Sequence, residues 1–230
     1  MSIKKSIGWC DMTWNPIKGL CPIGCKLPDG REYCYARRMY QRFKWDSELA
    51  LQYSTIDIYK KDWPKKSSKI FVCSTIEMFH PEIPKDWRDE IFETIKEFPQ
   101  HTFQILTKFP ENIDRKMPDN VWLGVTVTKN EEEWKIEELC NKIEHFQNWN
   151  PTIFVSAEPM LDNCKDTVHY FDEIEWLIIG RLTGHGYKHD PKKEWIETLK
   201  DNAFLSGVSV FLKDNLKEIW GENLIQEFPK

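Results

Sequence analysis

Short apolar runs recur along the chain from Lys69 onward, and longer amphipathic segments separate them. Each run is four to seven residues long and nearly continuously apolar, which is typical of strands buried on both faces in a parallel sheet. The predicted strands are residues 69–75, 102–108, 121–127, 152–158, 176–181 and 208–213, with a short first strand near residues 17–20.

The segments between these runs carry the signals of amphipathic helices. Pro84 suits the first position of a helix, and an apolar face follows it until Pro99. Asn130, followed by three glutamates, indicates a helix cap with acidic residues in the first turn. Further helices are predicted to begin at Asp190 and to cover residues 33–45.

Strands that alternate with helices indicate βαβ units. Six or seven such units are recognisable, fewer than the eight of a closed barrel, and the connection of residues 109–120 is too short for a long helix. We therefore predict an α/β fold, a partial open (β/α)6 barrel of the TIM type, in one domain that covers residues 1–230.

Polar side chains follow the predicted strands, where such a barrel has its active face. The candidate catalytic residues among them are His80 as a general acid and Lys108 and Lys213 as anion-binding groups. Their alternative roles are a histidine that caps a loop and lysines held in salt bridges. The whole set is Ser74, Thr75, Glu77, His80, Thr107, Lys108, Thr126, Thr128, Ser156, Glu158, Arg181, Thr183, His185 and Lys213.

Three cysteines, Cys21, Cys25 and Cys34, lie in one short segment after the first predicted strand. Cysteine thiolates hold iron–sulfur clusters, and a four-iron cluster with three cysteine ligands keeps one iron open for a substrate or cofactor. Structural zinc is the competing occupant and needs a fourth ligand. The chain offers Cys10, Cys73, His80 or His185 for that place, and unrelated core cysteines are the third alternative.

Composition favours metal ligands or free thiols over a disulfide framework. The chain has seven cysteines, an odd number, and its first residues lack the apolar core of a secretory signal. No run approaches the roughly 18 apolar residues of a membrane span. We therefore expect a cytoplasmic protein without a membrane partner, with Cys73, Cys140 and Cys164 as buried free cysteines.

The net charge of −5 is distributed unevenly. Residues 1–66 hold thirteen Lys and Arg against seven Asp and Glu, which leaves the remaining residues strongly acidic. Arg37, Arg38 and Arg42 follow Cys34 on the predicted helix, either as a phosphate-binding surface or as a solvated basic face. The excess of positive charge in residues 1–66 suits an anionic ligand near the cysteines.

The cysteine segment CPIGC, followed by YCYARRM, resembles the C-x3-C-x-aromatic-C motif of radical S-adenosylmethionine enzymes. Nearly the whole chain is similar to an uncharacterised, phage-associated radical-S-adenosylmethionine-like family whose distant relatives include the spore photoproduct lyase group. The other matching stretches are IGWCDMTWNPIKG, STIEMFHPEIP, PQHTFQILTKFPEN, NVWLGVTV, FVSAEPML, IEWLIIG and GVSVFLK.

This resemblance implies a partial barrel of the radical S-adenosylmethionine kind, with a [4Fe–4S] cluster on Cys21, Cys25 and Cys34. It also implies S-adenosyl-L-methionine as the second cofactor and a reductant of the flavodoxin or ferredoxin type as a partner. The cofactor-binding residues expected from it are Tyr33, Ser74, Thr75, Glu77, Ser156 and Glu158.

The chain departs from the family pattern at two places. About six residues are inserted between Cys25 and Tyr33, within KLPDGRE, which lengthens the loop that carries Cys34. Residues 180–186 read GRLTGHG where the family usually has GGESG, so Arg181 and Thr183 stand where a glutamate is expected. The first departure bears on the cluster and the second on cofactor or substrate contacts.

Three functional hypotheses follow. The first is a radical S-adenosylmethionine enzyme that acts on a nucleic acid or nucleotide. The second is a non-catalytic nucleic-acid-binding module stabilised by zinc or an iron–sulfur cluster. The third is a degenerate member that binds S-adenosylmethionine without cleaving it, which the altered segment 180–186 suggests.

Overall fold

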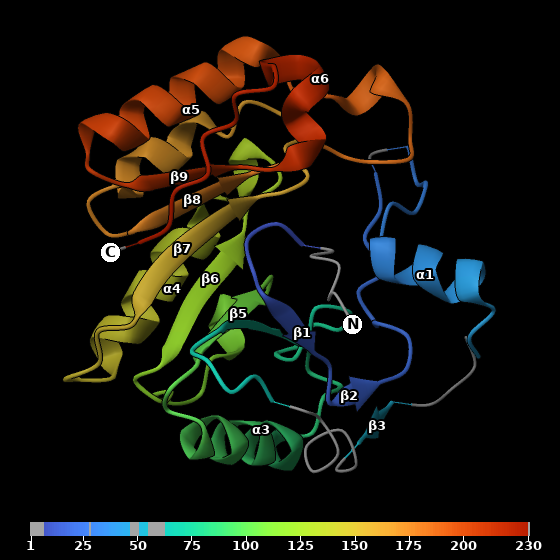
Figure 1. Cartoon of the computed structure of the whole chain (residues 1–230), viewed down its shortest axis with the longest axis vertical. Helices are drawn as coiled ribbons and strands as arrows, with labels where there is room; N and C mark the ends of the chain where they lie inside the picture. Colours follow the sequence, from blue (N-terminus) through green and yellow to red (C-terminus); the bar gives the residue numbers. More distant parts are fainter. Residues whose placement is uncertain (1–6, 28, 47–50, 55–62, 230) are drawn as a thin grey trace. The chain divides into compact units, whose positions relative to one another are not determined.

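The structure is a computed structural model that describes residues 7–27, 29–46, 51–54 and 63–229 (Figure 1). Its internal contacts cluster in two compact units, unit 1 (Met1–Ile105) and unit 2 (Leu106–Lys230). The organisation in one domain stays a prediction.

Unit 1 is built on parallel strands in the order β1-β4-β5. They are β1 (Met12–Trp14), β4 (Lys69–Val72) and β5 (Thr102–Thr107), whose last residues run into unit 2. Met12 pairs with Ile70, and Lys69 pairs with Thr102. The side chains of Trp14, Ile70 and Phe103 are fully buried and form the core of this unit.

The first parallel strand is not the one that the pattern predicts. The predicted strand near residues 17–20 is β2 (Ile17–Lys18), which pairs antiparallel with β3 (Gln52–Tyr53) in a separate small sheet. The strand beside β4 is β1, five residues earlier. Pro16 separates the two, because proline has no N–H for a strand ladder.

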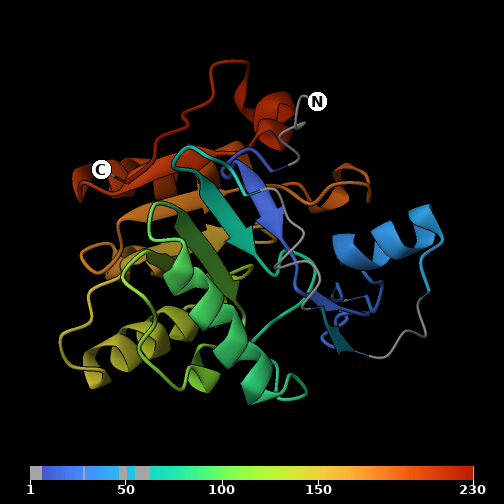
Figure 2. The same ribbon diagram turned by 60° about the horizontal axis from the view of Figure 1, so that its bottom comes forward.

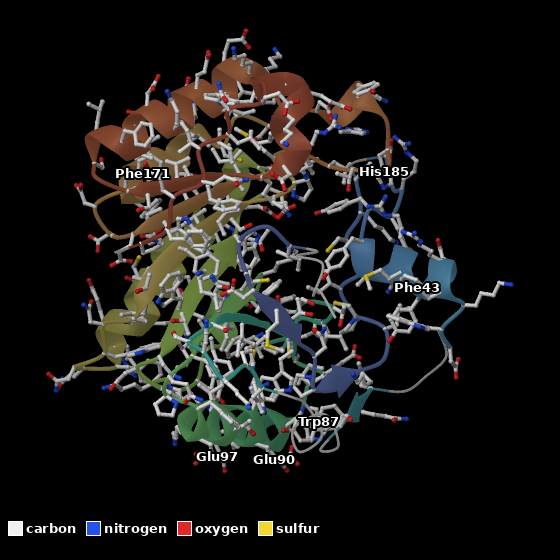
Figure 3. The ribbon with its side chains drawn as sticks, in the orientation of Figure 1. Phe43, Trp87, Glu90, Glu97, Phe171 and His185 are labelled. Carbon is white, nitrogen blue, oxygen red and sulfur yellow. The ribbon has the colours of Figure 1, made fainter. Side chains whose placement is uncertain are left out.

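Among the described residues of unit 1, two helices accompany these strands. The helix α1 (Tyr35–Phe43) lies within the predicted range 33–45, and α3 (Lys85–Glu97) begins directly after Pro84. In Figures 1 and 2, α1 lies next to β2 and β3. Figure 3 shows Glu90 and Glu97 pointing outward from α3, whose opposite face buries Ile91 and Ile95.

Unit 2 is a second set of parallel strands, in the order β6-β7-β8-β9. The strands are β6 (Val121–Thr126), β7 (Thr152–Ala157), β8 (Trp176–Ile179) and β9 (Ser209–Leu212). All residues of β8 are buried, as expected for a strand covered on both faces.

Three helices belong to the described part of unit 2: α4 (Trp134–His145) connects β6 to β7, α5 (Lys193–Leu205) connects β8 to β9, and α6 (Lys217–Trp220) follows β9. Of these, α4 packs on β6 and α5 on β9. The predicted cap at Asn130 begins a short 3-10 turn, η2 (Asn130–Glu132), ahead of α4. The other 3-10 turns are η1 (Pro110–Asn112), η3 (Lys165–Tyr170), η4 (Tyr187–His189) and η5 (Asp214–Leu216).

The predicted alternation of parallel strands and helices is confirmed in both units, so the chain has a mixed α/β fold. The six predicted main strands are all present, each within its predicted range. Among the described helices, none has the length and apolar character to cross a membrane.

Candidate metal centre

The loop that carries Cys21 and Cys25 is held against α1 by Arg37. The Nη2 atom of Arg37 donates to the carbonyl oxygen of Cys21 at 3.1 Å, and Nη1 donates to Glu32 Oε1 at 3.1 Å. Gly24 has a φ of +56°, and a Cβ on it would lie 3.1 Å from Arg37 Nη2. Glycine therefore allows both the turn between the two cysteines and the close approach of the guanidinium.

The chain after Cys25 pairs back on itself as a small hairpin, which we call the 26–32 hairpin and whose described residues are 26, 27 and 29–32. Lys26 and Glu32 form an antiparallel bridge, and the N–H of Leu27 donates to the carbonyl of Arg31 at 2.8 Å. The next pair in this register is Cys25 and Tyr33, where the Tyr33 N–H donates to the Cys25 carbonyl at 3.0 Å. The 26–32 hairpin thus brings Tyr33 beside Cys25, so the extra residues do not separate Cys25 from Cys34.

The thiols of Cys25 and Cys34 meet at the start of α1. Donation from the Cys25 thiol lowers the pKa of Cys34 to about 6, and the backbone N–H groups of Ala36 and Arg37 and the charge of Arg37 act in the same direction. Backbone N–H groups at a helix start favour an anion. Burial raises the pKa of Cys21, and the charges of Cys34 and Glu77 add to the rise.

The loop after β4 reaches the same cysteines. The backbone N–H of Glu77 donates to the Cys21 thiol, and the buried Glu77 carboxylate accepts the N–H of Phe79 at 3.1 Å. Tyr35 donates its hydroxyl to the carbonyl of Ser74. Unit 1 therefore brings the predicted residues Ser74 and Glu77 to the cysteine loop.

The remaining predicted residues of this loop differ in their surroundings. The Ser74 hydroxyl donates to Asn15 Oδ1 at 3.1 Å, and Thr75 is half-buried beside it. His80 Nδ1 accepts the backbone N–H of Glu82 at 3.2 Å, so His80 caps its loop, which is the alternative role weighed for it. Cys73 is buried, and burial raises the pKa of its thiol.

Predicted residues of unit 2 gather around Gly180, directly after β8. Lys213 and Glu158 form an ion pair. A Cβ on Gly180 would lie 3.0 Å from Lys213 Cδ and 3.1 Å from Glu158 Cδ, so a larger residue at this position would crowd the pair. Ser156 is 1% exposed, and its hydroxyl has no hydrogen-bond partner among the described residues. Such a buried orphan group is unusual and suits a polar ligand.

Arg181 is the centre of a second ion-pair group in unit 2. Its guanidinium donates to Asp190 at 2.9 Å and to Glu218 at 2.5 Å, and its backbone exchanges two hydrogen bonds with Asn215. Arg181 and Asp190 have side chains only 15% and 14% exposed. Arg181 therefore ties the loop after β8 to η5 and α6.

The other predicted positions of unit 2 lie at the ends of its strands or in the loops that follow them. Lys108 is half-buried, and Thr107 accepts the N–H of Phe109 at 2.9 Å. Thr126 is buried at the end of β6, and Thr128 donates to Glu132 through its N–H and its hydroxyl. Thr183 is exposed, and His185, labelled in Figure 3, is half-buried.

The donor set of unit 1 fits an iron–sulfur cluster by its chemistry. Cys21, Cys25 and Cys34 are free thiols, and one of them is a thiolate near neutral pH. Within the described parts of the chain, no three His, Cys, Asp or Glu side chains converge into a ready-made metal site. The three thiols would therefore come together fully only when the metal group binds, as is common where metal binding is coupled to folding.

Sequence reasoning missed the residues that position this loop. The sequence assigns Arg37 to a phosphate-binding surface or a solvated basic face, whereas its contacts with Cys21 and Gly24 join positions 16 and 13 residues apart. The sequence does hold one signal for the 26–32 hairpin. Its Asp-Gly pair is a turn signature, and it stands at the centre of the insertion.

The pKa shifts predict a pH profile for alkylation. Iodoacetamide reacts with thiolates, so the labelling rate of Cys34 in chelator-treated protein is expected to be half-maximal near pH 6. Cys21 is expected to label more slowly at neutral pH, because its pKa is raised. Mass spectrometry of the labelled peptides checks both rates, with Cys140, whose pKa is about 11, as an internal reference.

Arg37→Ala provides the matched test of this profile. Removing the guanidinium charge is expected to move the midpoint of Cys34 labelling to higher pH, because that charge stabilises the thiolate. Equal labelling midpoints for Cys34 and Cys140 would contradict the stabilisation of the Cys34 thiolate at the start of α1.

No curated protein and no solved structure matches the chain. A family model described as "Protein of unknown function (DUF5131)" matches residues 4–227, nearly the whole length. The chain therefore belongs to the DUF5131 family.

Proposed function

We propose that this chain is a radical S-adenosylmethionine enzyme that holds a [4Fe–4S] cluster on Cys21, Cys25 and Cys34. The observation that carries the proposal is the hydrogen bond from the Tyr33 N–H to the Cys25 carbonyl. It places Tyr33 and Cys34 directly after Cys25 in space, as the C-x3-C-x-aromatic-C motif requires in sequence. The insertion therefore does not count against the motif.

The residues around the cysteines supply orientation and charge. A cluster of this kind supplies the electron that cleaves S-adenosylmethionine to methionine and a 5′-deoxyadenosyl radical, which abstracts hydrogen from a substrate. Arg37 fixes the Cys21 carbonyl against α1, and the start of α1 favours the Cys34 thiolate. Burial of Cys21 limits the access of water and oxygen to this side of the loop.

The expected cofactor contacts divide between the two units. Tyr33, Ser74, Thr75 and Glu77 would bind S-adenosylmethionine from unit 1, and Glu77 already contacts Cys21 through its backbone. In unit 2, Ser156 and Glu158 stay candidate cofactor-binding residues, and the orphan hydroxyl of Ser156 supports a polar ligand there. This assignment requires the partial open barrel of radical S-adenosylmethionine enzymes.

The proposed substrate is a nucleic acid or nucleotide, and the proposed electron donor is a flavodoxin or ferredoxin in the cytoplasm. The substrate class is supported by the basic first part of the chain. Lys108 and Lys213 stay candidate catalytic residues. Lys213 is ion-paired with Glu158, so it would act on substrate only after that pair opens.

Anaerobic reconstitution tests the proposal. Protein incubated with iron, sulfide and dithiothreitol is expected to bind about four irons, the number in one such cluster, and to turn brown. Addition of dithionite and S-adenosylmethionine is then expected to give 5′-deoxyadenosine, measured by chromatography. One zinc without iron or sulfide would instead identify the metal-stabilised binding module. A cluster with S-adenosylmethionine binding but no cleavage would identify the degenerate member.

A further inference from the structure

The end of α1 carries a basic and aromatic surface that the proposed cluster chemistry leaves unused. We define the α1 surface as Arg42, Phe43, Lys44 and Trp45, which are all exposed; Figure 3 labels Phe43. Residues 32–46 hold four cations, and their two carboxylates are Glu32 and Asp46. Glu32 is paired with Arg37, so the balance of this segment is positive.

The aromatic rings of the α1 surface are stacked on one another. The ring centroids of Phe43 and Trp45 lie 5.4 Å apart at an interplanar angle of 26°. The guanidinium of Arg42 lies 5.5 Å from the centroid of Phe43. Despite these contacts, Phe43 and Trp45 are 52% and 47% exposed. About half of a planar aromatic stack is therefore open to a ligand.

The backbone holds this stack in place. Lys44 adopts a φ of +52° after the helix, and the N–H of Trp45 donates to the carbonyl of Tyr40 at 3.0 Å. Tyr40 contacts the Trp45 ring edge-on, and its hydroxyl exchanges hydrogen bonds with Gly19 at 2.7 and 3.1 Å. The rings are thus preorganised, so the protein loses little conformational entropy when a ligand binds to the stack.

A hollow of about 510 Å³ adjoins the stack. Arg37, Gln41, Lys44 and Trp45 are among the residues that line it. This volume is in the range of small-ligand sites and suits one nucleotide. Arg37 also donates to the carbonyl of Cys21, so one side chain joins this hollow to the cysteine loop.

We propose that the α1 surface and the adjoining hollow bind single-stranded nucleic acid. Unpaired bases have free planar faces for Phe43 and Trp45, and Arg42 and Lys44 can contact the phosphates beside them. A duplex hides those faces, and an acidic peptide has none to offer. That the bound strand is also the substrate rests on the proposed radical chemistry, which begins at the other end of the same helix.

Fluorescence anisotropy with a labelled 12-nucleotide single strand tests this proposal. Anaerobically purified protein is titrated without reductant or S-adenosylmethionine, with DNA and RNA strands and with the matching duplex. Saturable binding of a single strand, and weaker binding of the duplex, is expected. Affinity should fall with salt, with a slope of about −0.7 in log K against log salt for each phosphate contact.

Variants of the α1 surface identify the contacts. Phe43→Ala and Trp45→Ala are each expected to lower affinity about tenfold, because each removes one stacking partner. Arg42→Gln with Lys44→Gln is expected to flatten the salt slope. Phe43→Tyr keeps a planar aromatic ring and should bind the strand like wild type. Circular dichroism checks that each variant is folded.

Matched controls lie in unit 2. Phe204 is 43% exposed with Lys200 5.6 Å from its ring, so Phe204→Ala removes a similar cation-bearing aromatic, and Lys188→Gln removes an exposed charge. Both controls should bind like wild type. Unchanged affinity of Phe43→Ala and Trp45→Ala, or equal binding of duplex and single strand, would overturn the proposal. Displacement of the bound strand by an acidic peptide of equal charge would also overturn the proposal.

The test separates this proposal from the proposed function. Strand binding without 5′-deoxyadenosine in the reconstituted enzyme would retain the α1 surface and reject the radical chemistry. Production of 5′-deoxyadenosine by a protein that binds no strand would retain the chemistry and reject the nucleic-acid site.

Discussion

Replacement of Cys34 by alanine is expected to remove the iron–sulfur cluster and to abolish production of 5′-deoxyadenosine. Cys34 is the thiol with the lowered pKa, and it lies where the N–H groups of α1 favour a thiolate. Loss of an outer hydrogen-bond partner of a metal ligand already costs roughly 10- to 100-fold in affinity or activity, so loss of the ligand itself should cost more. Iron content and 5′-deoxyadenosine are measured on the same reconstituted sample.

Two further variants sharpen this result. Cys140→Ala, which removes a thiol on α4, should keep full iron content and activity. A variant in which one serine replaces residues 26–32 should also keep the cluster, because the hairpin only returns the chain from Cys25 to Tyr33. A Cys34→Ala protein that retains four irons would rule out the assigned ligand set.

Replacement of Arg181 by alanine should lower the free energy of unfolding by about 3 kcal/mol, the scale of breaking a mostly buried ion pair. The change leaves Asp190 without its cation and removes the link to Glu218. Glu218 is 59% exposed and can return to water, but Asp190 cannot. Urea unfolding monitored by tryptophan fluorescence measures the loss.

The matched control for this prediction is Glu218→Gln, which should cost less than about 1 kcal/mol because that side chain is mostly exposed. Calorimetry should show that the Arg181→Ala protein still binds S-adenosylmethionine, because the wild-type guanidinium is ion-paired with two carboxylates. A stable variant that has lost S-adenosylmethionine binding would instead make Arg181 a cofactor ligand.

The strands were predictable because each is buried on both faces. A strand such as β8 needs apolar residues at successive positions, and this leaves a continuous run in the sequence. The helices were predictable for a related reason, since α3 and α4 bury one stripe and expose the other. Strand β1 was missed because three residues beside a proline give no such run.

The candidate metal centre was predictable only in part. The three thiols could be named, since their spacing is local. A salt bridge of Lys213 was among the alternatives, but neither its partner Glu158 nor the Arg37 contact with Cys21 could be named, because only the folded backbone brings these positions together. Arg181 was expected to alter cofactor contacts, and its two carboxylate partners lie 9 and 37 residues away.

The 26–32 hairpin makes the loop between the second and third cysteines tolerant of length. Antiparallel pairs are added two residues at a time, and each added pair moves only the tip while Cys25 and Tyr33 stay at its base. Spacing along the sequence is therefore a poor measure of how close Cys25 and Tyr33 lie in the fold. A search for the proposed motif that allows an insertion of an even number of residues at this point would accept chains that a fixed spacing rejects.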